Sequence, residues 1–237
     1  MEQEAKIKLE DFSYPRKPNQ FISWFNSVSE NLSREQVYSL REGRDRILKK
    51  LHEEASIIYD FFSSNSRLLN SLCELKFSIK NESWDALLVR GEDKIYLEIA
   101  CAFMSRERRL RNTILNSKGS VSLTSILKED SKRELSEEHY FPPKSELLDK
   151  KICEILGVIR GKLDNGITYM PKTMLFVGYE SFAFKYKDEK NLLKKTVREF
   201  YAQKSESFVQ KNICRLVLVA DDASCFMSFC NKRVIKC

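Results

Sequence analysis

One stretch of the sequence decides the fold, and it reads Trp84-Asp85-Ala86-Leu87-Leu88-Val89-Arg90-Gly91-Glu92-Asp93-Lys94-Ile95-Tyr96-Leu97-Glu98-Ile99-Ala100. A tight-turn sequence at 90–93 separates two apolar segments, which predicts a β-hairpin. Asp85 begins the first strand, and Glu98 lies deep in the second strand between two apolar neighbours. An ionised carboxylate in apolar surroundings is costly unless an ion pair or a metal compensates it, so Glu98 is the first candidate functional residue.

The segments around the hairpin complete an α/β pattern. A capping box at Ser33 and Gln36 begins a long helix whose apolar stripe reaches Phe62, with Gly43 as an interruption. Apolar and polar residues alternate over 73–79, as in a half-buried strand. Further on, periodicity predicts helices over 106–116, 145–163 and 189–209, strands over 173–177 and 215–220, an edge strand near 226–229, and a loop-rich segment over 120–143. This order predicts a mixed central β-sheet flanked by helices.

Composition excludes several other classes of protein. The 237 residues include only 7 glycines, 5 prolines and 2 histidines, which disfavours a turn-rich β-sandwich and a histidine-rich metal site. No glycine spacing matches a dinucleotide fingerprint or a Walker A loop. The chain has no apolar run of membrane-spanning length, no secretory signal and an odd number of cysteines, 7. We therefore expect reduced thiols, a cytoplasmic location and no membrane partner.

The sequence also divides into two regions. Residues 1–32 mix aromatic side chains with prolines and basic residues, which indicates an N-terminal arm. Such an arm either docks on the core or remains mobile and meets a partner, and docking is the interpretation we favour. Residues 33–237 are expected to form a single α/β domain.

Three acids form the candidate site. A hairpin would bring Asp85 and Glu98 together, and a hard divalent cation would relieve their repulsion. Glu54 falls on the apolar stripe of the first long helix, where it needs a partner or a position at the boundary with water. Simpler roles stay open for the hairpin acids: Asp85 could cap its strand or pair with Lys94, and Glu98 could form a salt bridge with Arg109 or Arg111.

Two acids carried on the second and third strands of a meander resemble the active site of the PD-(D/E)XK nuclease superfamily. By the order of elements the resemblance covers roughly residues 35–220. It implies a restriction-endonuclease-like core and hydrolysis of phosphodiesters in nucleic acid with Mg²⁺ or Mn²⁺. It also implies that Asp85, Glu98 and the Ile99 carbonyl hold the metal, and that Glu54 matches the acid on the first helix. The metal would activate water and stabilise the charge on the phosphate.

One departure from the family pattern affects activity. The family carries a lysine two residues after the second acid, but this chain has Ala100 there. If the domain is active, another element must supply the cation, and the candidates are Lys76, Arg108, Arg111 and Lys151. Otherwise the domain is a catalytically inactive binding or assembly protein that contacts nucleic acid or a protein partner.

Basic residues favour nucleic acid as the partner. The net charge is +7, from 41 basic and 34 acidic residues. Two groups carry much of the excess, and both are expected to attract a phosphate backbone unless they are only solvated helix faces. The first group is Arg106, Arg108, Arg109, Arg111 and Lys118; the second is Lys185, Lys187, Lys190, Lys194, Lys195 and Arg198.

Overall fold

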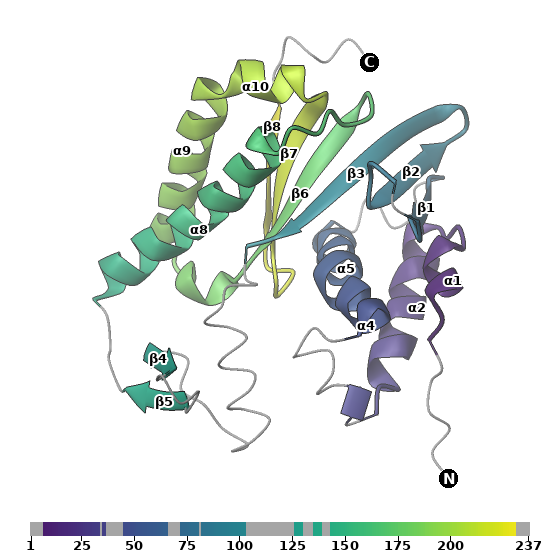
Figure 1. The fold of residues 1–237 in the computed structure, drawn as a ribbon, viewed down its shortest axis with the longest axis horizontal. Helices are drawn as coiled ribbons and strands as arrows, with labels where there is room; N and C mark the ends of the chain where they lie inside the picture. The colour runs from purple at the N-terminus through teal and green to yellow at the C-terminus, as the bar shows by residue number, and fades with distance from the viewer. Residues whose placement is uncertain are drawn as a thin grey trace.

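A computed structural model of the chain describes residues 7–33, 35–36, 45–65, 72–80, 82–102, 126–129, 135–138 and 143–230. A six-stranded mixed sheet crosses the molecule in the order β1-β2-β3-β6-β7-β8 (Figure 1). Its central strands β3, β6 and β7 are parallel, and the outer strands pair antiparallel. The strands are β1 (Glu74–Phe77), β2 (Ala86–Arg90), β3 (Asp93–Cys101), β6 (Thr173–Tyr179), β7 (Ile213–Ala220) and β8 (Phe226–Cys230). The α/β class and the mixed sheet are therefore confirmed.

The predicted hairpin is present between β2 and β3. Arg90 pairs with Asp93, so two residues make the turn. The first of them, Gly91, has φ +60°, a left-handed conformation that glycine adopts without the steric cost of a Cβ. In this register Ala86 pairs with Leu97, and Asp85 therefore lies just before the strand, beside the middle of β3.

Helices cover both faces of the sheet (Figure 1). One face carries α2 (Pro18–Glu30), α5 (Ser56–Ser64) and the π-helical turn η1 (Leu51–Ala55); α1 (Leu9–Ser13) contacts β1, and α4 (Arg46–Lys50) leads into η1. The other face carries α8 (Lys144–Asp164) and α9 (Lys187–Gln203), with η2 (Ser181–Ala183) and α10 (Ser205–Gln210) at its ends. Side chains alternate along β6, so that Leu175 and Val177 pack under α8 and α9 while Phe176 packs on the face of α5.

The residues expected to form the arm dock on the core. Phe12 of α1 and Phe21 of α2 are buried, and the rings of Phe12 and Trp24 meet edge to face with centroids 5.3 Å apart. The capping box at Ser33 and Gln36 is also present, because each backbone N–H donates to the other side chain, at 2.9 and 3.2 Å. Gly43 lies outside the described residues.

Two predictions about secondary structure need correction. The segment expected to be loop-rich contains an antiparallel pair, β4 (Ile126–Glu129) and β5 (Leu135–Glu138), whose short charged strands carry no clear period-two pattern. The helix expected over 189–209 is two helices, because α9 ends at Gln203 and α10 begins at Ser205. The helix expected over 106–116 lies outside the described residues. None of the described helices is long and apolar enough to cross a membrane.

The central sheet should be sensitive to cavities. Leu216 of β7 has no exposed surface, so Leu216→Ala should lower the free energy of unfolding by about 2–5 kcal/mol in urea denaturation. Leu192 of α9 is 40% exposed, and Leu192→Ala should change it by less than about 0.5 kcal/mol. Equal losses in the two variants would contradict this description of the core.

Candidate functional site

Asp85 reaches across the end of β2 to the backbone of β3. Its Oδ2 accepts a hydrogen bond of 2.7 Å from the backbone N–H of Ile99. In an extended strand the N–H and C=O of one residue point toward the same neighbouring strand. The Ile99 carbonyl is therefore directed to the side of β3 where the Asp85 carboxylate lies, as a shared ligand set would require.

Glu98 lies on the face of β3 that α8 covers. Its side chain is only 10% exposed, and its Oε1 forms an ion pair with Nζ of Lys162 near the end of α8. Ala100 is two residues further along the strand and points to the same face, where it packs in the cluster that contains Ile159 of α8. Lys162 thus brings an ammonium group to the face of β3 that bears Glu98 and Ala100.

Glu54 lies in η1 and pairs with Lys50, four residues earlier. The turn η1 contacts the end of β3, where the thiol of Cys101 lies 3.6 Å from the carbonyl oxygen of Glu53. Asp85 is close enough to interact electrostatically with both Glu54 and Glu98. The three acids predicted from the sequence therefore belong to one electrostatic cluster.

The pKa values of all three acids are raised. Burial is the largest cause in each case, because it disfavours the charged form, and the charge of Asp85 adds to the shifts of Glu54 and Glu98. The pKa of Glu54 reaches about 7. Lys50 and Lys162 oppose these shifts without cancelling them. Burial therefore favours the neutral form of these carboxyls, and the two lysines offset this only in part.

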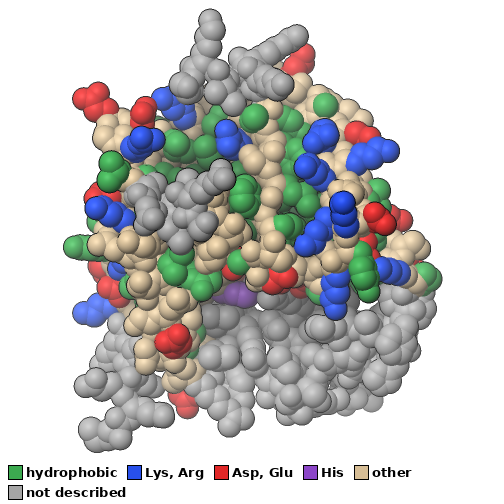
Figure 2. All heavy atoms as spheres, turned by 180° about the vertical axis from the view of Figure 1, so that it is seen from behind, with side chains coloured by type: hydrophobic (Ala, Val, Ile, Leu, Met, Phe, Trp, Pro, Cys, Tyr) green, Lys and Arg blue, Asp and Glu red, His purple; other side chains and the backbone are tan. Residues whose placement is uncertain are grey.

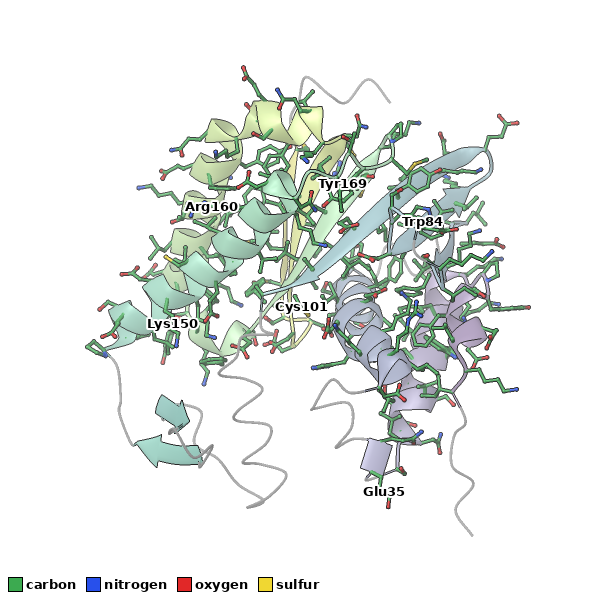
Figure 3. All side chains as sticks on the ribbon, viewed as in Figure 1. Glu35, Trp84, Cys101, Lys150, Arg160 and Tyr169 are labelled. Carbon is green, nitrogen blue, oxygen red and sulfur yellow. The ribbon has the colours of Figure 1, made fainter. Side chains whose placement is uncertain are left out.

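Lys162 is held by the residues that follow α8. Asn165 Nδ2 donates to the hydroxyl of Tyr169 at 2.7 Å, and that hydroxyl donates to the carbonyl oxygen of Lys162 at 3.2 Å. Tyr169 is buried, and Figure 3 shows it beside α8, with Trp84 on the far side of β3. The ring of Trp84 lies 6.1 Å from that of Tyr96, so aromatic side chains flank the acids.

Other predicted site residues lie elsewhere. Lys151 pairs with Glu154 and Glu180 at 2.9 and 2.7 Å, and Lys76 on β1 makes no ion pair with the acid cluster among the described contacts. Lys94 is exposed. The Asp85 carboxylate accepts its hydrogen bond from the Ile99 N–H and forms no ion pair with Lys94 among the described contacts. The arginines predicted at this site or for nucleic acid, Arg106, Arg108, Arg109 and Arg111, lie outside the described residues.

The donor set fits a cation that keeps part of its water shell. In the described part of the chain, no group of three or more histidine, cysteine, aspartate or glutamate side chains could enclose a metal ion. Asp85, Glu98 and the Ile99 carbonyl offer two carboxylates and one carbonyl oxygen. Mg²⁺ is commonly bound in this way, through one or two carboxylates, with waters and substrate oxygens as its other ligands.

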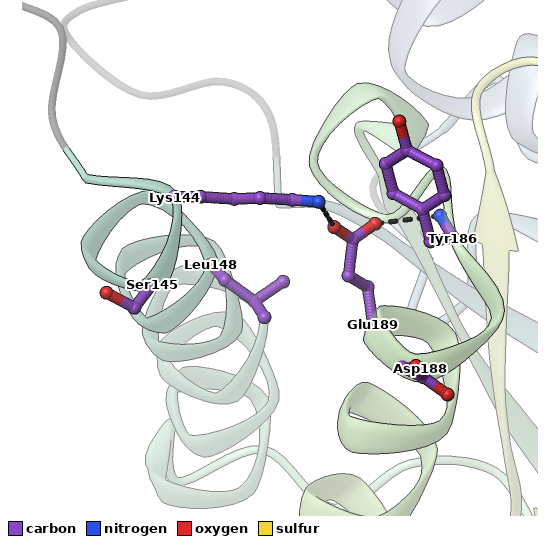
Figure 4. A pocket seen from close by; sticks show the side chains of 6 residues that line it. All are labelled: Lys144, Ser145, Leu148, Tyr186, Asp188 and Glu189. Carbon is purple, nitrogen blue, oxygen red and sulfur yellow. Dashed lines mark hydrogen bonds and ion pairs between the residues drawn. The ribbon is translucent and has the colours of Figure 1, made fainter.

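A hollow of about 500 Å³ lies between the first turns of α8 and α9 (Figure 4). Lys144 pairs with Glu189 there, and Glu189 Oε2 accepts a 2.8 Å hydrogen bond from the N–H of Tyr186. The ammonium of Lys144 also lies 4.1 Å from the centre of the Tyr186 ring. These contacts explain the buried Glu189 as a residue that caps the start of α9. We therefore do not take this hollow as the candidate functional site.

Comparisons of the chain with protein-family models, with curated proteins and with solved structures find no match. Its function is therefore inferred from the geometry of its own residues.

The raised pKa of Glu54 predicts a pH dependence of stability. Its folded value of about 7 lies above its ordinary value of 4.5, so the folded state binds more protons between these limits and loses stability as the pH rises. Glu54→Gln removes this titration. The difference between its melting temperature and that of wild type should therefore shift in favour of the variant when the pH rises from 5 to 8. Burial and the charge of Asp221 raise the pKa of Asp60 to about 8. Asp60 is present in both proteins, so its titration cancels in the comparison.

A matched control uses Glu82, an exposed acid outside the cluster. Glu82→Gln should follow the wild-type melting curve at every pH, as measured by calorimetry. If Glu54→Gln also runs parallel to wild type, the carboxylate is not held in the environment described here.

Proposed function

We propose that the chain is a metal-dependent nuclease of the PD-(D/E)XK type in which α8 supplies the active-site lysine. The observation that carries this proposal is the ion pair between Lys162 and Glu98, on the face of β3 that also bears Ala100. A cation from another element is what an active member with alanine at this position requires.

The architecture supports the same reading. A helix precedes a three-stranded meander, acids lie beside the second strand and on the third, and a helix then leads to a parallel strand. This is the order of elements that the resemblance implies for a restriction-endonuclease-like core. Under this proposal, Asp85 beside β2 and Glu98 on β3 correspond to the family's two acids.

Each residue has a distinct part in the proposed reaction. The metal would be held by Asp85, Glu98 and the Ile99 carbonyl. Glu54 would add negative charge from η1. The bound ion would supply Lewis-acid stabilisation of the phosphate and a more acidic water. Burial raises the pKa values of the three acids, and a divalent cation would also stabilise their ionised forms, which the two lysines do only in part.

Lys162 acts as a charged donor in this proposal. Burial would lower its pKa, but the attraction of Glu98 and Asp85 outweighs burial and raises the pKa above the ordinary value of 10.5. The ammonium therefore stays protonated at neutral pH and is unsuited to act as a general base. A fixed positive charge near a reacting phosphate stabilises the negative charge that develops in the transition state.

One observation favours a second candidate function. The Lys162–Glu98 pair already compensates the buried carboxylate without a metal, as expected of a relative that has kept the fold and lost cleavage. That protein would bind nucleic acid or a protein partner. The two candidates differ in a single measurable property, which is turnover in the presence of a divalent cation.

Cleavage of labelled single-stranded DNA, single-stranded RNA and plasmid tests the proposal. Wild type should cut at least one substrate in Mg²⁺ or Mn²⁺, and EDTA should stop the reaction. Asp85→Asn and Glu98→Gln should abolish it. Lys162→Met should lower kcat by about 10²–10³-fold, as expected when one donor to a developing anion is removed.

Lys151 provides a matched control on the same helix. It is also a largely buried lysine paired with acids, but its partners are Glu154 and Glu180. Lys151→Met should retain turnover, provided that its circular dichroism shows a folded protein. Equal losses for Lys151→Met and Lys162→Met would contradict the role of Lys162. A wild type that binds these nucleic acids but cuts none of them would establish the second candidate.

A further inference from the structure

A second hollow lies between the first half of α9 and the start of β8. Its volume is about 480 Å³, and it is open to solvent on the side of the molecule where Figure 2 shows Lys and Arg side chains gathered. Four of its eight lining residues are lysines, and three come from β8 and the turn before it. The lining residues are Lys185, Lys187, Lys190, Asn191, Lys194, Cys225, Phe226 and Met227. We name this hollow the α9–β8 groove.

The lysines of the groove form a row because of their helical spacing. Lys187, Lys190 and Lys194 are three and four residues apart, so they share one face of α9. Arg198 continues the row by one turn and is exposed. From first to last the row spans eleven residues, which is about 16 Å of helix. The adjoining face of α9 is apolar and packs on the sheet through Leu193 and Val197.

The charge of this row is not cancelled by the described acids. None of the ion pairs in the described part of the chain involves the four groove lysines. The neighbouring acids of α9 have other positions, since Asp188 lines the hollow of Figure 4 and Glu189 pairs with Lys144. Lys185, Lys187 and Lys194 are exposed, and Lys190 is half-buried. Regularly spaced lysines that form no ion pair with a described acid are complementary to a regularly spaced polyanion.

The floor of the groove is apolar and already packed. The ring of Phe226 meets the ring of Phe61 edge to face at 5.3 Å, and the thiol of Cys225 lies 3.1 Å from the hydroxyl of Tyr179. These side chains are used within the fold and do not offer a free ring on which a base could stack. The groove therefore fits a ligand recognised through its charge and not through its bases.

We propose that the α9–β8 groove binds the sugar-phosphate backbone of the nucleic acid on which the acid cluster acts. The choice of nucleic acid over another polyanion rests on the proposed function. Lys185, Lys187, Lys190 and Lys194 contact successive phosphates, and Arg198 extends the track. Of the residues predicted for nucleic acid, Lys194 lines the groove, whereas Lys195 does not.

The strand register indicates how long a nucleic acid must be to contact both the groove and the acid cluster. Phe226 at the groove is aligned through Val219 and Gly178 with Cys101, which is three residues beyond Glu98. Three strand spacings and three residues correspond to about 17 Å in an ideal sheet. At about 3.4 Å of rise per nucleotide, a substrate that engages both sites extends at least about five nucleotides from the scissile bond.

Salt-dependent binding tests the groove independently of catalysis. Anisotropy of a fluorescent 20-nucleotide single-stranded DNA is measured in EDTA between 50 and 300 mM NaCl. Each lost phosphate contact on a single strand lowers the slope of log K against log salt by about 0.7. Lys190→Gln/Lys194→Gln should therefore reduce the slope by about 1.4 and weaken binding about tenfold or more near 0.1 M salt.

The control variant removes the same charge at two positions outside the groove, on the β1–β3 side of the sheet. Lys80 follows β1 and Lys94 lies on β3, and both are exposed. Lys80→Gln/Lys94→Gln should lower the slope by much less than the groove variant. A second groove variant, Lys185→Gln/Lys187→Gln, should reproduce the loss, and melting curves should confirm that every variant is folded.

Three results would overturn the inference. These are equal slopes for groove and control variants, no binding by wild type at 50 mM salt, or competition by a poly-glutamate peptide as strong as that by unlabelled DNA. The last result would assign the groove to an acidic protein. Because binding is measured without metal, failure to cleave in the separate assay leaves this outcome unaffected, and the two proposals can fail independently.

Discussion

The structure depends on the compensation of one buried charge, the carboxylate of Glu98 in the middle of β3. β3 is hydrogen-bonded on both sides, and the α8 face that Glu98 shares is otherwise apolar. A carboxylate in this place requires a partner, and Lys162 provides it. The pair fixes the last turns of α8 against β3, and the bonds from Tyr169 and Asn165 hold the backbone at the same point.

The same compensation explains why the acids form a site instead of an isolated salt bridge. Asp85 bonds the backbone of Ile99, next to Glu98, and its charge also acts on Glu54 across the sheet. Burial raises the pKa values of all three acids, and Lys50 and Lys162 offset these shifts only in part. A divalent cation at Asp85 and Glu98 would stabilise their ionised forms, which is the physical basis of the proposed nuclease.

Much of the fold and the acids of the site follow from local patterns. The turn sequence at 90–93 predicts the β2–β3 hairpin, and the alternation over 73–79 predicts the strand β1. The register of the hairpin in the structure brings Asp85 beside Glu98. Local sequence patterns could not show which lysine reaches Glu98. Lys151 and Lys162 are eleven residues apart, about three turns, so they lie on nearly the same side of α8. Only the path of α8 over the sheet decides which of them reaches Glu98. The charged β4–β5 pair was missed because its strands lack an apolar alternation.

The proposed function requires that Asp85 and Glu98 together bind a divalent cation. Anomalous diffraction from crystals of the protein grown at pH 8 with Mn²⁺ tests this most directly. We expect a manganese peak within about 2.0–2.6 Å of a carboxylate oxygen of each residue, the range of oxygen ligands to such hard cations. Saturating Mn²⁺ with no peak between these carboxylates, and with Lys162 still paired to Glu98, would contradict it.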